Sequence, residues 1–184
     1  EDFEGARNAS NGTDVRDFGG SRQLYMGAAV GGAKRLMQQD GSIVAGVPMF
    51  RKTFDLSSGI RRARLYATGL GVYNVYINGE RVGQTDDDGK TLYDELKPGA
   101  TEMKKTVFYT THDVTALLQE GKNAIGAEVS SGWWNGAIVH GMYGSKPNAF
   151  RALLKIELED GTVQVIPTDL SWLSNTNGPL RKGD

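Results

Sequence analysis

The sequence predicts an all-β domain, an antiparallel jelly-roll β-sandwich that contains one short helical turn. From Met49 onward, apolar and polar residues alternate in short runs, which is the period of strands that bury one face. Turn-forming residues separate these runs, and Asn78-Gly79 is the clearest such pair. No longer period of the kind that marks solenoids or propellers repeats along the chain. These observations favour a single sandwich of short strands.

The chain divides into an arm and a module. Residues 1–48 are rich in Gly, Ser, Asn and Asp without a sustained period, and we expect them to form an irregular N-terminal arm. The sandwich module is expected over residues 49–180, and residues 181–184 are expected to begin a linker to a further domain. Within the module, alternation predicts strands near residues 50–54, 63–67, 72–77, 81–82, 105–111, 123–129, 150–158, 162–167 and 170–173.

The segments that connect these strands contain residues that typically form turns. Asn and Gly tolerate positive φ, so Asn78-Gly79 predicts a two-residue hairpin turn of type I′. The polar stretch 85–104 is expected to be mostly loop. A helical turn is expected within residues 112–121, with Asp113 as the capping acceptor and Gly121 at its end.

Charge and composition exclude several classes of function. The 21 basic and 22 acidic residues leave a formal charge of −1, which gives no basic surface for nucleic acid or for an anionic membrane. No window approaches the roughly 18 apolar residues that span a bilayer. The chain has no Cys, so disulfides, thiolate zinc sites and a cysteine nucleophile are excluded.

Catalytic patterns are also missing from the sequence. The two histidines, His112 and His140, fit neither a zinc motif nor a Ser-His-Asp arrangement. Nothing among the carboxylates marks a pair as the acid and base of a glycosidase. A small glycosidase therefore remains only a minor alternative, which would require a cleft with two carboxylates about 5 to 10 Å apart.

The segment Gly132-Trp-Trp-Asn-Gly136 is the strongest candidate for ligand contact. An indole that faces outward could stack on the apolar face of a sugar ring, while Asn135 offers a donor and an acceptor to hydroxyls. Alternatively, both indoles close the end of the sandwich, because Trp is highly buried on average. Both interpretations stay open for Trp133 and Trp134, and Tyr143 and Asn148 are secondary candidates in the loop that follows.

The run Asp86-Asp87-Asp88 precedes Gly89 in a polar loop. Carboxylates in such a loop are the ligands that Ca²⁺ prefers, so a calcium site is one hypothesis. The spacing lacks the alternation and the distal Glu of a complete calcium loop, which favours a solvated charged loop instead.

Three segments taken in order resemble a known family. They are Phe50-Arg-Lys-Thr-Phe54; the run from Ala63 through Gly69, Gly71, Tyr73, Asn78-Gly79 and Val82-Gly83; and Asp113-Val-Thr followed by Gly121, Asn123 and Gly132-Trp-Trp-Asn-Gly136. This ordered set resembles the N-terminal domain of bacterial α-L-rhamnosidases, and Pro167-Thr-Asp169, Trp172 and Gly178-Pro179 fit the same pattern. The chain departs from it at Ala100, where relatives place Trp, and in the extra acidic segment 85–90.

The resemblance implies a galactose-binding-like jelly roll, some relatives of which bind rhamnose with the help of calcium. It places catalysis in a separate helical barrel, so this chain alone is not expected to be an enzyme. The expected function is that of an accessory module that binds or orients rhamnose-containing carbohydrate beside a downstream catalytic domain. A purely structural inter-domain sandwich is the alternative. The relatives also imply a secreted or periplasmic bacterial protein.

Overall fold

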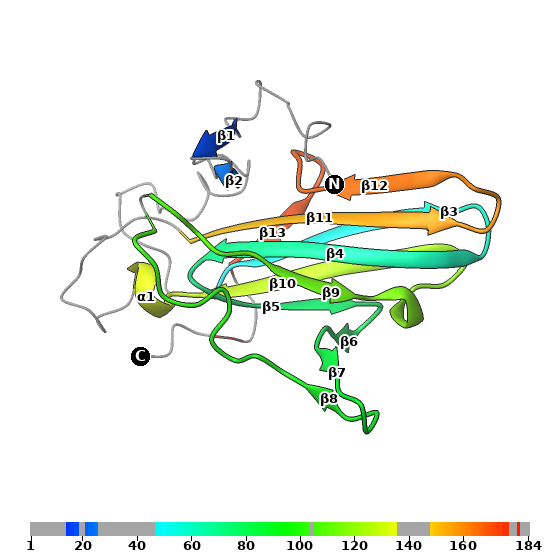
Figure 1. The fold of residues 1–184 in the computed structure, drawn as a ribbon, viewed down its shortest axis with the longest axis horizontal. Coiled ribbons are helices and arrows are strands. Elements are labelled where there is room, and N and C mark those ends of the chain that lie inside the picture. The colour runs from blue at the N-terminus through cyan, green and yellow to red at the C-terminus, as the bar shows by residue number, and fades with distance from the viewer. Residues whose placement is uncertain are drawn as a thin grey trace.

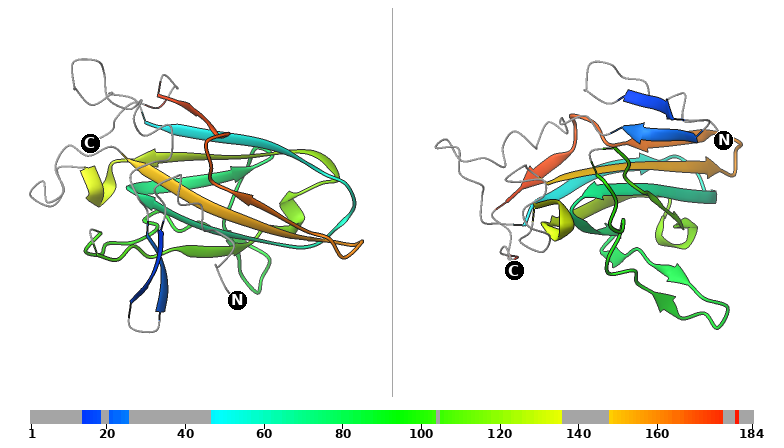
Figure 2. Two further views of the ribbon diagram at one scale, coloured as in Figure 1. Left: turned by 90° about the horizontal axis from the view of Figure 1, so that it is seen from above. Right: turned by 60° about the vertical axis from the view of Figure 1, so that its left-hand side comes forward.

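Two antiparallel sheets lie face to face in the computed structural model, which describes residues 14–18, 21–25, 47–103, 105–135, 148–176 and 180 (Figures 1 and 2). The five-stranded sheet has the order β13 (Leu173–Asn175), β3 (Met49–Leu56), β10 (Gly121–Ser130), β5 (Val72–Ile77) and β6 (Glu80–Arg81). The four-stranded sheet has the order β12 (Val163–Pro167), β11 (Ala149–Leu158), β4 (Ile60–Leu70) and β9 (Thr110–Asp113). The predicted jelly-roll sandwich is confirmed.

Alternating burial explains why the two sheets pack together. In β11, Phe150 and every second residue after it are buried, and in β10 the same holds from Asn123 onward. Successive side chains of a strand point to opposite faces, so each strand contributes one apolar face to the shared core. Phe150 lies at its centre, where its ring is 5.6 Å from that of Tyr73, 6.1 Å from that of Trp172 and 6.3 Å from that of Phe50.

The hairpin between β5 and β6 has the predicted turn. Asn78 has φ 52° and Gly79 has φ 92°, so both central residues have the positive φ of a type I′ turn. The side chain of Asn78 also accepts a hydrogen bond from Ala124 N at 2.9 Å, which ties the turn to β10. The turn therefore fixes the register of β5 and positions the neighbouring strand.

The helical turn is shorter than expected. A 3-10 turn, η4, spans Thr115–Leu117, and His112 and Asp113 belong to strand β9. The carboxylate of Asp113 accepts hydrogen bonds from Thr115 N at 3.0 Å and from the Thr115 hydroxyl at 2.6 Å. Asp113 thus supports the start of the turn, but the N-cap residue is Val114, which makes no side-chain capping hydrogen bond. The turn ends at Leu118, and Gly121, which was expected to end it, is the first residue of β10.

Several boundaries differ from the predicted ones. Strand β9 begins at Thr110, because the ladder that β9 forms with β4 starts at this residue. The last strand begins at Leu173, because residues 170 and 171 form a turn. The loop 85–104 contains the small hairpin β7 (Gln84–Thr85) and β8 (Thr91–Leu92). Within the arm that was expected to be irregular, β1 (Asp14–Phe18) and β2 (Ser21–Tyr25) pair as an antiparallel hairpin.

The two ends of the sandwich module lie side by side. Val47 N donates a hydrogen bond to Leu180 O at 3.2 Å, so the chain enters and leaves the sandwich at adjacent points.

Among the described residues, no helix is long and apolar enough to cross a membrane.

Candidate functional site

The tryptophan segment forms a single turn of helix, α1 (Gly132–Asn135), directly after β10. Gly132 has φ +47°, and a Cβ at this position would lie 2.6 Å from Val72 Cγ2 and 2.9 Å from Val72 N. Only a residue without a side chain allows this close approach to the start of β5. The backbone therefore holds the two indoles at the end of the five-stranded sheet.

The two indoles differ in their environment. Trp134 is buried, with 6 % of its surface exposed, and packs against Met103. Trp133 is half-buried at the rim of the same cluster, together with Leu70 and Val107. One ring thus plugs the end of the sandwich, and the other presents part of its surface to solvent.

The remaining predicted contact residues have different placements. Asn148 is buried, and its amide donates a hydrogen bond to Ser130 O at 2.7 Å, so it holds the end of β10 to the start of β11. Asn135 is described only as part of α1, and Tyr143 lies outside the described residues. The roles of these three residues in ligand binding stay predictions.

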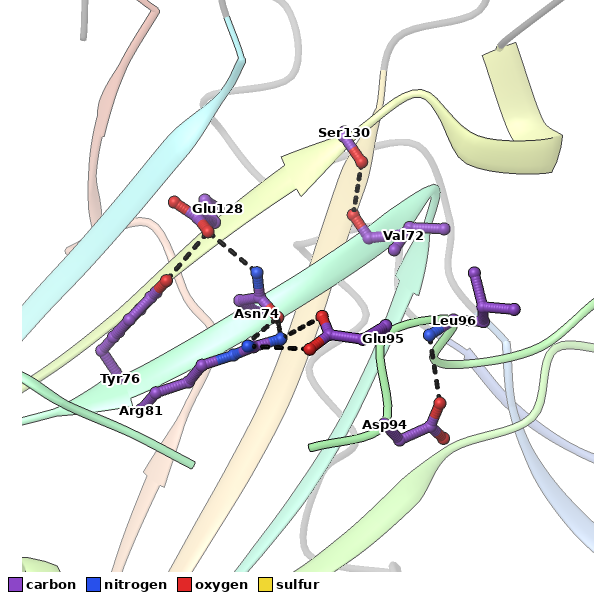
Figure 3. A network of polar contacts seen from close by, with 9 residues as sticks. All are labelled: Val72, Asn74, Tyr76, Arg81, Asp94, Glu95, Leu96, Glu128 and Ser130. Atoms are coloured by element: carbon purple, nitrogen blue, oxygen red, sulfur yellow. Dashed lines mark hydrogen bonds and ion pairs between the residues drawn. The ribbon is translucent and has the colours of Figure 1, made fainter. Parts of the chain in front are cut away.

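A row of polar side chains covers the outer face of the five-stranded sheet beside the tryptophan segment (Figure 3). Glu128 on β10 lies opposite Asn74 on β5, and its Oε1 accepts hydrogen bonds from Asn74 Nδ2 and from the Tyr76 hydroxyl, both at 2.9 Å. Burial, followed by the hydrogen bond and the negative charge of Glu128, raises the pKa of Tyr76. Further along, Ser130 donates to Val72 O at 3.2 Å, and α1 begins two residues later.

Arg81 lies at the end of this row that is farther from α1 (Figure 3). Its guanidinium donates to Asn74 Oδ1 from Nε at 3.2 Å and from Nη2 at 2.6 Å. The same group forms a two-pronged ion pair with Glu95, at 3.1 and 2.5 Å, and lies 4.6 Å from the centre of the Tyr93 ring. The hydrogen bond from Arg81 lowers the pKa of Glu95. Arg81 therefore joins the loop after β8 to the sheet.

We name the residues Val72, Asn74, Tyr76, Arg81, Glu95, Glu128 and Ser130 the polar row. From Tyr76 to Val72 the row extends over four residue-to-residue steps of strand, which is about 13 Å. Its carboxylate, amide, hydroxyl and guanidinium groups offer donors and acceptors side by side, with the half-buried Trp133 beyond one end. This combination can hydrogen-bond hydroxyl groups and stack on an apolar ring face.

Asp86, Asp87 and Asp88 lie in the turn between β7 and β8. Asp86 Oδ1 accepts hydrogen bonds from Asp88 N at 3.1 Å and from Lys90 N at 2.8 Å, so the turn itself uses this carboxylate. Among the described residues, no group of three or more His, Asp or Glu side chains is arranged to hold a metal ion. The geometry therefore lends no support to calcium binding there, which stays a prediction.

The polar row is only partly visible in the sequence. The alternation in 72–77 was a usable signal, because it puts Val72, Asn74 and Tyr76 on the face opposite the buried Tyr73, Val75 and Ile77. Arg81 and Glu95 are far harder to pair from sequence, because a loop of irregular backbone brings them together.

Comparison with known families gives a direct result. The family model of the α-L-rhamnosidase N-terminal domain matches residues 58–184. The chain belongs to that family. This α-L-rhamnosidase N-terminal domain is 35 % identical over 142 residues to the α-L-rhamnosidase of Alteromonas sp. (strain LOR), which covers 76 % of this chain and 15 % of the relative.

Solved structures agree with this assignment. The α-L-rhamnosidase of Aspergillus terreus superposes on the N-terminal domain with a TM-score of 0.68 at 34 % identity, covering 83 % of this chain and 17 % of that one. The Streptomyces avermitilis α-L-rhamnosidase, solved in complex with L-rhamnose, gives a TM-score of 0.65 at 35 % identity, covering 78 % and 13 %. The chain therefore spans less than a fifth of the length of these relatives.

Proposed function

We propose that this domain is a non-catalytic accessory module of an α-L-rhamnosidase-type glycoside hydrolase that binds or orients rhamnose-containing carbohydrate. One observation carries the proposal, the division of the adjacent indoles into a buried Trp134 and a half-buried Trp133. A ring that served only to fill the core would gain by complete burial, whereas a ring that stacks on sugar needs an open face. The catalytic machinery then belongs to a downstream domain of a secreted or periplasmic polypeptide.

The polar row supports the same proposal. Stacking on Trp133 supplies contact area, but hydrogen bonds to hydroxyls supply the orientation of a sugar. Asn74, Glu128 and Ser130 lie on the outer face of the sheet between Arg81 and the tryptophan segment (Figure 3). The L-rhamnose complex of the Streptomyces avermitilis relative also favours rhamnose over other monosaccharides as the first ligand to test.

A structural inter-domain sandwich is the second candidate. It is favoured by the burial of Trp134 against Met103 and by the use of the Asn148 amide to hold the backbone of Ser130. In that case the indoles only close the end of the sandwich, and the polar row is an ordinary solvated sheet face.

Isothermal titration calorimetry of the chain with L-rhamnose, D-mannose and D-galactose distinguishes the two candidates. We expect saturable heat for L-rhamnose, its loss in Trp133→Ala and its partial recovery in Trp133→Phe, which keeps a ring. Tyr109→Ala is the matched control, because Tyr109 is an exposed aromatic residue with 48 % of its surface accessible and lies before β9 of the opposite sheet. Absence of heat at tens of millimolar sugar would favour the structural candidate.

A second set of titrations tests whether the turn that contains Asp86, Asp87 and Asp88 binds calcium. The same titration is repeated with added calcium and then with a chelator, in the unaltered chain and in Asp87→Asn. If these carboxylates serve only to stabilise the turn, we expect the same rhamnose affinity with calcium, with the chelator and in Asp87→Asn. An affinity that falls with the chelator and in Asp87→Asn would assign calcium to this turn.

A further inference from the structure

Arg151 on β11 carries a buried nitrogen atom without a partner. Its side chain is half-buried, and Nη1 of its guanidinium makes no hydrogen bond. Among the described residues, no ion pair includes Arg151. A guanidinium keeps its charge in proteins, so it cannot avoid the cost of burial by losing a proton. Arg151 therefore lacks both an acceptor for Nη1 and a counter-charge.

The side chain of Arg151 belongs to the outer face of the four-stranded sheet. It points away from the core, because both of its neighbours in β11 are core residues. Thr68 lies opposite on β4, and its hydroxyl donates a hydrogen bond to Phe108 O at 2.6 Å. The segment before β9 therefore crosses this end of the sheet, where it brings the exposed side chains of Phe108 and Tyr109.

An apolar band crosses the same face, one row of residues away from Arg151. The register places Pro167, Leu153 and Tyr66 side by side on β12, β11 and β4. The ring of Tyr66 lies 6.3 Å from that of Tyr109, which extends the band to the segment before β9. Aromatic residues and Arg are enriched where proteins bind one another, and an apolar patch with a polar border is typical of such surfaces.

The charges on this face are mostly positive. The register places four cations at outward positions of β4 and β11, namely Arg62, Arg64, Arg151 and Lys155. The carboxylates at outward positions of the described strands are Asp113 and Glu157. Both are engaged within the domain, because Glu157 pairs with Arg61 at 2.7 Å and Asp113 accepts a hydrogen bond from the Thr115 hydroxyl. The excess of positive charge favours an acidic partner.

We propose that this face docks against an acidic surface of the polypeptide beyond this chain, with a carboxylate of that surface bound to Arg151. We name it the docking face, and it consists of Tyr66, Tyr109, Arg151, Leu153, Val165 and Pro167. A carboxylate supplies both an acceptor for Nη1 and the missing negative charge, whereas a water molecule supplies only the acceptor.

The source of the partner follows from the size of the relatives. Their matched regions cover 13 to 17 % of their length, so polypeptides of this family carry most of their residues outside this domain. The inference rests on the accessory-module part of the proposed function. It does not depend on sugar binding, because the polar row belongs to the other sheet.

Hydroxyl-radical footprinting read by mass spectrometry tests the proposal, because it reports the exposure of individual side chains. The experiment compares this chain with the complete polypeptide that contains it. We expect Tyr109 and Val165, which are 48 and 45 % exposed here, to lose most of their oxidation in the complete polypeptide. Tyr93 and Leu96, in the loop after β8, should be oxidised equally in both forms.

Charge reversal at Arg151 should release the docking face. In the complete polypeptide, Arg151→Glu sets a negative charge against the partner carboxylate, so oxidation of Tyr109 and Val165 should return. Arg151→Met, which keeps an apolar stem, should restore part of it. Lys122→Glu reverses an exposed cation on β10 of the other sheet and should restore none.

Urea unfolding of this chain alone separates docking from folding. Arg151→Met removes a buried charge that has no partner, so the midpoint of unfolding should stay the same or rise. A lower midpoint would show that Arg151 is already satisfied within the domain, and would overturn the proposal.

Three footprinting results would also overturn it. The first is equal oxidation of Tyr109 and Val165 in the chain and in the complete polypeptide. The second is protection in this chain alone that grows with its concentration, which would assign the face to a second copy. The third is protection of this chain by D-glucuronate but not by D-glucose, which would assign Arg151 to an acidic sugar. A docked module without rhamnose heat in calorimetry would reject sugar binding and retain the docking face.

Discussion

The side-chain amides of Asn78 and Asn123 bind each other, with Asn78 Nδ2 donating to Asn123 Oδ1 at 2.9 Å. Asn123 is 3 % exposed and also donates to the carbonyls of Gln119 and Gly121. One side chain therefore joins the type I′ hairpin, the segment after η4 and the start of β10.

Replacing Asn123 with Ala should destabilise the domain. The partly buried hydrogen bonds to the carbonyl groups of Gln119 and Gly121 would be lost, and each contributes roughly 0.5–1.5 kcal/mol. We expect the free energy of unfolding in urea to fall by at least that amount. Lys122→Ala, one residue away on the exposed face, is the control and should change it by less than about 0.5 kcal/mol. Equal effects of the two substitutions would contradict a stabilising role for the Asn123 side chain.

Phe150 should be the most sensitive aromatic residue of the core. It is fully buried and contacts the rings of Phe50, Tyr73 and Trp172. Phe150→Ala is expected to cost about 3–5 kcal/mol of unfolding free energy, because the cavity lies where the sheets meet. Phe108→Ala, at a ring with 57 % exposure, should cost far less in the same urea titration. A loss below about 1 kcal/mol for Phe150→Ala would show that the two sheets do not pack tightly around this ring.

Alanine substitutions at two glycines with positive φ distinguish the cost of backbone strain from the cost of steric crowding. Gly161 has φ +84° and no atom within 4 Å of a built Cβ, whereas Gly132 has φ +47° and Val72 in that space. Gly161→Ala should cost only the strain of the left-handed region, about 1–2 kcal/mol. Gly132→Ala adds the clash with Val72 and should lower the melting temperature further and change the tryptophan fluorescence. Equal melting temperatures for the two variants would disprove the close packing of α1 on β5.

Stability should fall on mild acidification. The pKa of His112 in the folded protein lies below its ordinary value of 6.5, mainly because of burial. Below that value the unfolded chain binds a proton that the folded chain still lacks, so the free energy of unfolding decreases as the pH falls through 6.5 towards the folded pKa. Urea titrations between neutral and mildly acidic pH measure this slope. His112→Gln should flatten it, and an unchanged slope in this variant would assign it to other groups.

Local rules predicted the parts of the fold that depend on neighbouring residues. The Asn78-Gly79 turn, the Asp113 contact with Thr115 and strands such as β10 and β11 follow from φ preferences, side-chain acceptors and alternation. The burial of Lys97 and the pairing of Arg81 with Glu95 could not be predicted in this way. Both depend on where an irregular loop returns to the sheet, and a lone Lys in a polar stretch normally indicates exposure.

The hydrogen bond between Val47 and Leu180 bears on how such a domain fits into a longer polypeptide. Because the strands run out and back, the segments on either side of the sandwich depart from neighbouring points. A domain attached in this way adds bulk and surface to its polypeptide but almost no reach.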